Sequence, residues 1–187
     1  TEVFAKMADT QTPQGILTVL EQPVYDLTQL LEQPDPLFLM LENLQDPGNL
    51  GTMIRTGEGA GITGVIMNNQ TVDIFNPKTI RATMGSIFRV PFVYVPDLAL
   101  VLEQMHAKGI HTYAAHLKGQ EYYDSFSFRE PTAFLIGNEG NGLSKEISDQ
   151  AGQYLKIPME GRVESLNASI AAALLMYEAH RQRSARL

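Results

Sequence analysis

The sequence predicts an α/β fold, with a largely parallel sheet that has helices on both of its faces. From residue 36 onward, short continuous apolar runs, typical of fully buried strands, alternate with helical segments. The length of 187 residues and the hydrophobic content of 44% also suit one compact domain that folds around its own core.

The first 34 residues differ from the rest of the chain. We predict that residues 1–34 form an N-terminal extension or inter-domain linker, and that residues 35–187 form the main domain. Within the extension, residues 15–20 (GILTVL) are a strand candidate and residues 27–32 are a short helical turn. A Pro-Asp-Pro run then closes this section.

Six short apolar runs are the predicted strands of the main domain. They are residues 37–41, 64–67, 91–95, 110–116, 132–136 and 154–157. Their short length and their apolar character are typical of strands that are covered on both faces of a sheet.

Helices are predicted in the connections between these runs and after the last one. They are residues 50–59, 76–88 and 98–108, a short helix after Ser144, and residues 167–183. Pro77 marks the first turn of the second helix, Gly109 ends the third, and Ser144 caps the fourth.

The last helix is the longest and has an unusually apolar side for a terminal element. Its apolar residues are Ile170, Leu174, Leu175 and Tyr177. Because a terminal helix does not normally expose that much apolar surface, we predict a homodimer that buries the region around Ile170, Leu174 and Tyr177, with help from the helix that follows Asn49.

Composition excludes several classes of protein. The chain has no cysteine, which excludes disulfide and thiolate chemistry. The histidines have no ligand-like spacing, so we predict no metal site; they are His106, His111, His116 and His180. No apolar run approaches the roughly 20 residues of a membrane helix, and we expect a cytoplasmic protein without a membrane partner. The net charge of −7 argues against nucleic-acid binding over the whole surface but leaves room for a local basic patch.

Three loops that follow predicted strands carry more glycine and polar residues than a plain connection needs. They are NLQDPGNLGTMIR at residues 43–55, GNEGNGLS at residues 137–144 and IPMEGRVESLNAS at residues 157–169. In parallel sheets, ligands bind beyond the carboxyl ends of the strands. The three loops together therefore predict a binding site at that edge of the sheet.

The glycines of the second loop allow backbone amides to approach a ligand closely. Gly137, Gly140 and Gly142 fall within six residues, although a flexible turn with a helix cap explains such glycines equally well. Their spacing differs from the dinucleotide fingerprint, and no P-loop lysine follows them. Glu139 stands among them, where a carboxylate could meet a ribose hydroxyl or position a base.

Polar side chains mark the other two loops. Ser165, Asn167 and Ser169 alternate where the last helix starts, and either of the first two could be its N-cap, which does not explain all three. In the first loop, Asn49 lies at the predicted helix entrance and Arg55 nearly two turns further on. A lone arginine on a helix is commonly solvated or paired. Here, however, the segment after Arg55 contains more glycine than the end of a helix requires, which favours a functional role.

At these three loops the sequence resembles the SpoU, or TrmH, family of SPOUT RNA methyltransferases. The resemblance covers roughly residues 36–180 and includes all three motifs in the family's order, the second read as FLIGNEGNGLS. The run RATMGSIFRVP at residues 81–91 is similar to the family's connecting segment. The run DTQTPQGIL is similar to the junction after an amino-terminal RNA-binding domain in ribosomal-RNA members, so we expect such a domain to be missing from this chain.

The resemblance implies a deep C-terminal trefoil knot, a homodimer, and S-adenosylmethionine as the cofactor. On the matching positions, Gly137, Ile157 and Leu166 would hold the cofactor through backbone and apolar contacts, with Leu135 and Asn167 nearby. The reaction would be methyl transfer to a ribose 2′-hydroxyl of RNA, with 23S ribosomal RNA as the substrate. Transfer RNA as the substrate, or an idle knotted RNA-binding module, are the alternatives.

The resemblance also implies roles for the polar residues of the motifs. Arg55 matches the family's catalytic arginine, which works in the active site of the partner subunit. Because the pKa of arginine exceeds about 12, we favour a role in clamping phosphate or stabilising a developing alkoxide, with the proton acceptor left open. The supporting polar residues of the family are matched by Asn49, Glu139, Ser165 and Asn167.

Overall fold

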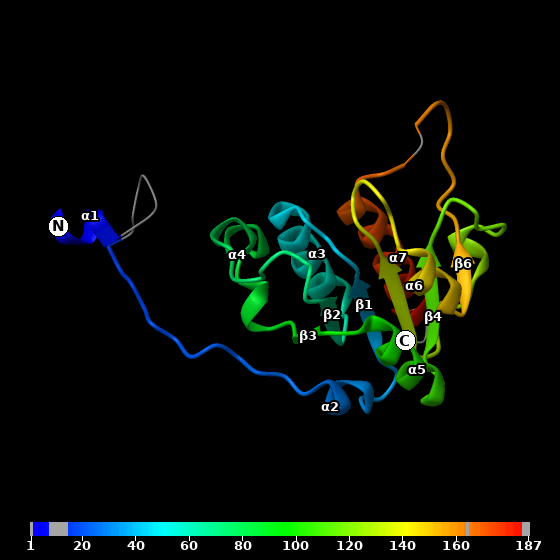
Figure 1. Cartoon of the computed structure of the whole chain (residues 1–187), viewed down its shortest axis with the longest axis horizontal. Coiled ribbons are helices and arrows are strands. Elements are labelled where there is room, and N and C mark those ends of the chain that lie inside the picture. Colours follow the sequence, from blue (N-terminus) through cyan, green and yellow to red (C-terminus); the bar gives the residue numbers. More distant parts are fainter. Residues whose placement is uncertain (1, 8–14, 164, 185–187) are drawn as a thin grey trace.

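The computed structural model describes residues 2–7, 15–163 and 165–184. In these residues, six strands form one sheet in the order β3-β2-β1-β5-β4-β6 (Figure 1). The strands are β1 (Leu37–Leu41), β2 (Gly64–Asn68), β3 (Phe92–Val95), β4 (His111–Ala115), β5 (Thr132–Ile136) and β6 (Gln153–Leu155). Each pair of neighbouring strands is parallel, which confirms the predicted α/β class and parallel sheet.

Helices cover both faces of this sheet. One face carries α3 (Pro47–Ala60), α4 (Pro77–Thr83), η1 (Ser86–Phe88) and α7 (Ala168–Ser184), and the other carries α2 (Leu27–Leu31), α5 (Leu98–Ala107) and α6 (Lys145–Gln150). The remaining short helices are α1 (Glu2–Met7) and η2 (Tyr123–Ser125). Each face of the sheet has its own hydrophobic core. Because successive side chains of β1 point to opposite faces, Leu39 packs under α3 and α7, whereas Phe38 packs under α5.

Two helices differ from their predicted bounds for local reasons. Helix α3 begins at Pro47, three residues early, because the Asp46 carboxylate caps it by accepting from the Asn49 N–H at 2.8 Å. The helix predicted at residues 76–88 is divided into α4 and η1. The division falls at Met84 and Gly85, whose φ angles of 51° and 89° lie in the left-handed region.

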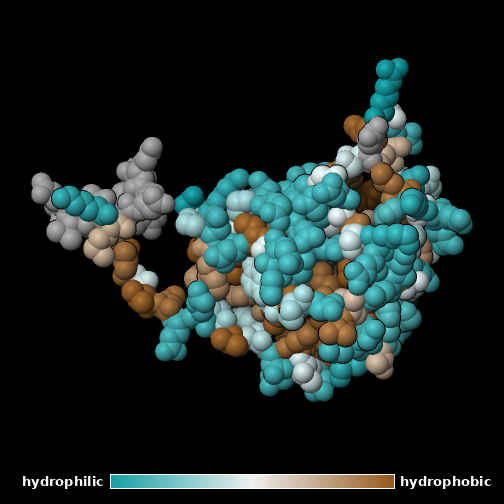
Figure 2. Space-filling view, in the orientation of Figure 1, coloured by the Kyte–Doolittle hydropathy of each residue, from teal (hydrophilic) through white to brown (hydrophobic). Residues whose placement is uncertain are grey.

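The strand predicted at residues 15–20 is wrong. This segment is extended but has no neighbouring strand, and Ile16 and Val19 are 82% and 88% exposed. Figures 1 and 2 show it running away from the sheet with hydrophobic side chains in the open. An apolar run becomes a strand only where another strand can take its backbone hydrogen bonds. The predicted turn that follows is confirmed as α2, which buries Leu30 and Leu31 in the core.

The apolar residues of α7 divide between two faces. Leu175 is fully buried against the sheet, together with Ala172 and Met176. Ile170 and Tyr177 are 51% and 49% exposed, and Leu174 is also partly exposed beside them. The chain's own core therefore covers one stripe of α7 and leaves a second apolar stripe in solvent.

Neither a membrane helix nor a metal site is found in the part of the chain that the structure describes. No helix there is long and apolar enough to cross a bilayer. No three His, Asp or Glu side chains there are grouped so that they could hold a metal ion. Two of the histidines have other partners, since His106 Nε2 lies 2.8 Å from Thr112 Oγ1 and His116 Nδ1 accepts from the Lys118 N–H.

Close packing of α3 on α4 leads to a first prediction. A Cβ at Gly51 would lie 2.5 Å from Ala82 Cβ and 2.7 Å from the Thr79 carbonyl oxygen, so Gly51→Ala overpacks a rigid contact. We expect it to lower the free energy of unfolding by about 1–3 kcal/mol in urea denaturation. The matched control is Gly59→Ala in the same helix, where the added methyl meets only the terminal hydroxyl of the half-exposed Tyr177 side chain and stability should hold or rise. Equal losses in both variants would contradict the packing argument.

Candidate active site

The first and second motifs meet because β1 and β5 are neighbours in the sheet. The Glu139 carboxylate, from the loop after β5, accepts three hydrogen bonds from the first motif, two from the loop after β1 and one from the first turn of α3. Its Oε1 accepts from the Asp46 N–H at 3.0 Å and from Asn49 Nδ2 at 3.1 Å, and its Oε2 accepts from the Gln45 N–H at 3.1 Å. One side chain thus ties together two loops that lie about ninety residues apart in the sequence.

The third motif joins the same network through Asn167. Its Nδ2 donates to Asn49 Oδ1 at 3.0 Å, while its Oδ1 accepts from the Ser169 N–H at 2.8 Å and the Ser169 hydroxyl at 2.6 Å. Asn167 is therefore the N-cap of α7, as one of the two predicted alternatives had it, and it also contacts the first motif. A continuous chain of hydrogen bonds, Glu139–Asn49–Asn167, links all three motifs.

The Glu139 side chain is held in its ionised form. Partial desolvation raises the pKa of this carboxyl, but the hydrogen bonds from Asp46, Asn49 and Gln45 outweigh it and bring the pKa below its usual value of 4.5. Both carboxylate oxygens are already engaged by donors. Glu139 thus acts at neutral pH as a charged anchor between the loops.

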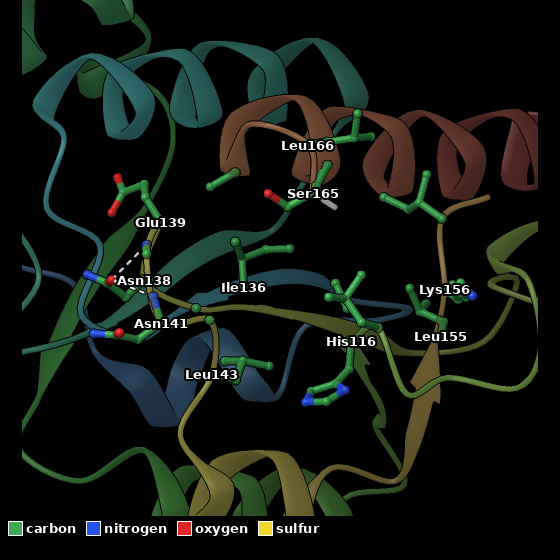
Figure 3. A pocket seen from close by; sticks show the side chains of 18 of the residues that line it. His116, Ile136, Asn138, Glu139, Asn141, Leu143, Leu155, Lys156, Ser165 and Leu166 are labelled. Carbon is green, nitrogen blue, oxygen red and sulfur yellow. Dashed lines mark hydrogen bonds between the residues drawn. The ribbon is translucent and has the colours of Figure 1, made fainter. Parts of the chain in front are cut away.

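A pocket of about 370 Å³ lies beside this network, between the loops that follow β4, β5 and β6 and the start of α7. Its volume falls within the range of roughly 300–1,000 Å³ that is usual for small-molecule sites. Five predicted site residues line it: Gly137, Glu139, Ile157, Ser165 and Leu166. In Figure 3, Ile136 lies in the middle, with Ser165 and Leu166 to one side of it and Leu143 to the opposite side.

The second loop is a closed turn that leads into the cap of α6 at Ser144. Asn138 and Gly142 exchange two backbone hydrogen bonds, of 3.0 and 2.8 Å, and Gly142 has a φ of 69°. A Cβ at Gly137 would lie 2.1 Å from the Gly142 carbonyl carbon and the Leu143 nitrogen, so no other residue fits there. The Asn138 side chain completes the turn by accepting from the Gly140 and Asn141 N–H groups (Figure 3).

The structure does not place every predicted cofactor residue on the pocket lining. Leu135 is fully buried in the core beneath α5 and α6, and its neighbour Ile136 faces the pocket, because side chains alternate along a strand. Asn167 lies next to the lining residues Leu166 and Ala168 and contacts the first motif.

The sequence did not point to the wall formed by the loop after β4. Ala115, His116 and Leu117 line the pocket there, and the His116 ring stacks on Tyr154 with centroids 5.0 Å apart. In the sequence, this wall could be inferred only from the position of the loop directly after a predicted strand. It lacks the dense glycine and polar pattern of the three motifs.

Arg55 lies on the outer face of α3, away from the pocket. Its side chain is exposed, and no hydrogen bond or ion pair joins it to another described residue. The outer face of α3 is continuous with the exposed stripe of α7, because a Cβ at Gly59 would lie 2.9 Å from the Tyr177 hydroxyl. Arg55 therefore shares one surface with the apolar residues that α7 leaves in solvent.

Comparison with known proteins assigns this fold and site to a class of methyltransferases. The family model described as "SpoU rRNA Methylase family" matches residues 36–177. The chain belongs to the SpoU rRNA methylase family, which confirms the resemblance of the three motifs. The trefoil knot that the resemblance implies stays a prediction.

Curated relatives and solved structures agree with this assignment. The chain is 35% identical over 94% of its length to the 23S rRNA (guanosine(2553)-2'-O)-methyltransferase RlmP of Bacillus subtilis, and it covers 68% of that protein. It is 34% identical to the 23S rRNA (uridine(2479)-2'-O)-methyltransferase of Streptomyces viridochromogenes, over 92% of this chain and 62% of that protein. The structure of the SpoU methyltransferase AviRb from the same organism, in complex with AdoMet, matches with a TM-score of 0.80 at 34% identity, over 87% of this chain and 63% of that one. The chain thus spans about two thirds of the length of these relatives.

The lowered pKa of Glu139 generates a prediction about acid stability. Because the folded-state pKa is depressed, the ionised carboxylate stabilises the fold above the usual value of 4.5, and this contribution is lost as the pH falls through the folded-state pKa. We expect Glu139→Gln to be less stable than the parent at neutral pH and to lose less stability on acidification. Urea midpoints at neutral pH and at about pH 3 measure both effects. The control is Glu103→Gln on the exposed face of α5, and a parent-like acid loss in Glu139→Gln would contradict the anchor role.

Proposed function

We propose that the chain transfers a methyl group from S-adenosylmethionine to a ribose 2′-hydroxyl of RNA, with 23S ribosomal RNA as the substrate. The observation that carries the proposal is the hydrogen-bond chain Glu139–Asn49–Asn167, which joins the three family motifs at the mouth of a pocket. The relatives named as 23S rRNA 2'-O-methyltransferases support the reaction and the substrate. With ribosomal RNA as the substrate, the protein works in the cytoplasm.

The pocket fits S-adenosylmethionine in size and in chemistry. Its walls are mostly apolar side chains and loop backbone, and the turn at Gly137 leaves no room for a side chain where the loop closes on itself. In this proposal Gly137, Ile157 and Leu166 hold the cofactor, while Leu135 and Asn167 support them from behind. When bound, the cofactor supplies an activated methyl group on a positively charged sulfur.

The polar residues of the site then orient the reacting groups. A 2′-hydroxyl must lie in line with the methyl group and must lose its proton. Glu139 fixes the Asn49 carboxamide, and Asn49 in turn holds Asn167 and the start of α7. Ser165 lines the pocket with a hydroxyl that no described residue engages, so it is free to bond the ligand.

We further propose that the active form is a homodimer built on the outer faces of α3 and α7. The exposed Ile170, Leu174 and Tyr177 provide an apolar centre for such an interface, and Arg55 lies beside them. Across a twofold axis, Arg55 reaches the partner's pocket. Its permanently charged guanidinium there clamps phosphate or stabilises the developing alkoxide.

We also propose that residues 1–34 connect this domain to a further RNA-binding part. The exposed extended segment at residues 15–20 supports this role. The charge balance agrees, because a chain with a net charge of −7 repels phosphate and attracts RNA only through local cations. Among the described residues, the exposed cations without an ion pair are Lys6, Arg55, Arg81, Lys118, Arg129 and Arg162.

A methylation assay tests the proposed reaction. We expect transfer of a labelled methyl group to unmodified 23S ribosomal RNA, with the label recovered in a 2′-O-methyl nucleoside. Asn167→Asp should fold normally but lose at least about tenfold in rate, because aspartate keeps the cap acceptor of α7 and loses the donor to Asn49. Preferential labelling of transfer RNA would support the first alternative substrate. Failure of the protein to bind S-adenosylmethionine at millimolar concentration would contradict the proposal.

Mixing two impaired variants tests whether Arg55 serves the partner subunit. Arg55→Ala and Asn167→Asp chains, each strongly impaired alone, should regain activity when they are mixed and allowed to exchange subunits. A mixed dimer has one site with an intact network and an arginine from across the interface. Random pairing makes such dimers only about half of the population, so partial recovery is expected. No recovery, or full activity of a sedimenting monomer, would place Arg55 in its own subunit's site.

A further inference from the structure

The buried carboxyl of Glu42 has no part in the site described so far. Glu42 directly follows β1, is 7% exposed, and continues the strand ladder through its N–H, which donates to the Ile136 carbonyl at 3.0 Å. Alternation along β1 directs its side chain to the face that α5 and α6 cover, opposite to Leu41. A carboxyl group in such a position is costly unless its oxygens are hydrogen-bonded.

The partner of this carboxyl is the far end of the second loop. Glu42 Oε2 accepts from the Ser144 N–H at 2.7 Å, a short bond of the charge-assisted kind between residues 102 positions apart. Ser144 is the residue at which the loop ends and α6 begins, and its hydroxyl accepts from the Ile147 N–H. The bond therefore fixes the point where the loop returns to the body of the protein.

Between its two carboxylate anchors, the second loop is held by bonds within itself and by the Asn138 Nδ2, which donates to the Asn43 carbonyl at 2.9 Å. Glu139 holds its beginning and Glu42 its end, and the turn between them is closed by bonds within the loop around Asn138. The residues of this stretch, from Asn138 to Leu143, form one wall of the pocket. Glu42 itself is not among the residues that line the pocket.

We propose that Glu42 is a positioning residue for the cofactor pocket, acting through the Ser144 N–H on the Gly140–Leu143 wall. This inference rests on the proposed function for the identity of the ligand, but the effect on the loop itself does not depend on it. Without the acceptor, the Ser144 N–H loses its partner, and the loop keeps only the anchors near its beginning, at Glu139 and at Asn138, whose Nδ2 donates to the Asn43 carbonyl at 2.9 Å. The wall then samples positions in which Leu143 no longer lines the pocket.

The first test compares Glu42→Leu, Glu42→Gln and a matched control. Leucine removes the acceptor, whereas glutamine keeps one acceptor oxygen of similar reach. The control is Asp97→Ala, which removes a carboxylate that accepts backbone N–H groups of Ala99 and Leu100 at the start of α5, away from the pocket. Calorimetry with S-adenosylhomocysteine measures affinity, and hydrogen exchange measures the amides of residues 140–144.

We expect Glu42→Leu to weaken binding by about tenfold or more and to speed exchange at residues 140–144 while the strand amides stay protected. Glu42→Gln should retain most of the affinity, and Asp97→Ala should change neither quantity. If Glu42→Leu affects affinity and loop exchange no more than Asp97→Ala does, the inference is overturned. If the parent does not bind the ligand, the proposed function fails, while loop exchange still tests Glu42.

A second pair of variants removes the donor, in case Glu42→Leu does not fold. Ser144 has a φ of −60°, which proline adopts, so Ser144→Pro deletes the N–H without changing the local backbone angle. Ser144→Ala keeps the N–H and loses only the hydroxyl cap. Faster loop exchange and weaker binding in Ser144→Pro than in Ser144→Ala support the inference, and equal behaviour of the two overturns it.

Discussion

The ionised carboxylate of Glu139 is the group on which the arrangement of the site depends. It collects two backbone donors and one side-chain donor from the first motif, which no neutral side chain of that size could match. Because Asn49 Nδ2 is engaged by Glu139, its Oδ1 is directed to Asn167. One charge thereby orients an amide, and the amide orients the start of the last helix.

Helix α3 connects the site to the rest of the molecule. Its first turn carries Asn49, its middle packs tightly against α4 at Gly51, and Gly57 brings it close to Met176 of α7. A helix fixed on both flanks holds its N-terminal turn still, so the network that begins at Asn49 has a rigid base. Its outer face, with Arg55, stays open for a partner.

Much of the fold could be predicted because its strands are buried on both faces. β1 and β5 begin and end where their apolar runs do, and the hydroxyl cap at Ser144 marks a helix start that depends on the nearby Ile147 N–H. Residues 15–20 have the same apolar character, yet they stay extended and exposed. Local sequence specifies what a segment can become, and the presence of a neighbouring strand decides whether it does.

For the site, the sequence by itself determined which loops carry the chemistry, since polar residues and glycines after parallel strands meet at one edge of the sheet. Only the tertiary structure decided how they meet. It showed that Asn167 caps α7 and also contacts Asn49, that Ile136 faces the pocket where Leu135 does not, and that Glu42 holds Ser144. These are contacts between residues far apart in the sequence, and their partners are set by strand order and side-chain direction, which no local pattern encodes.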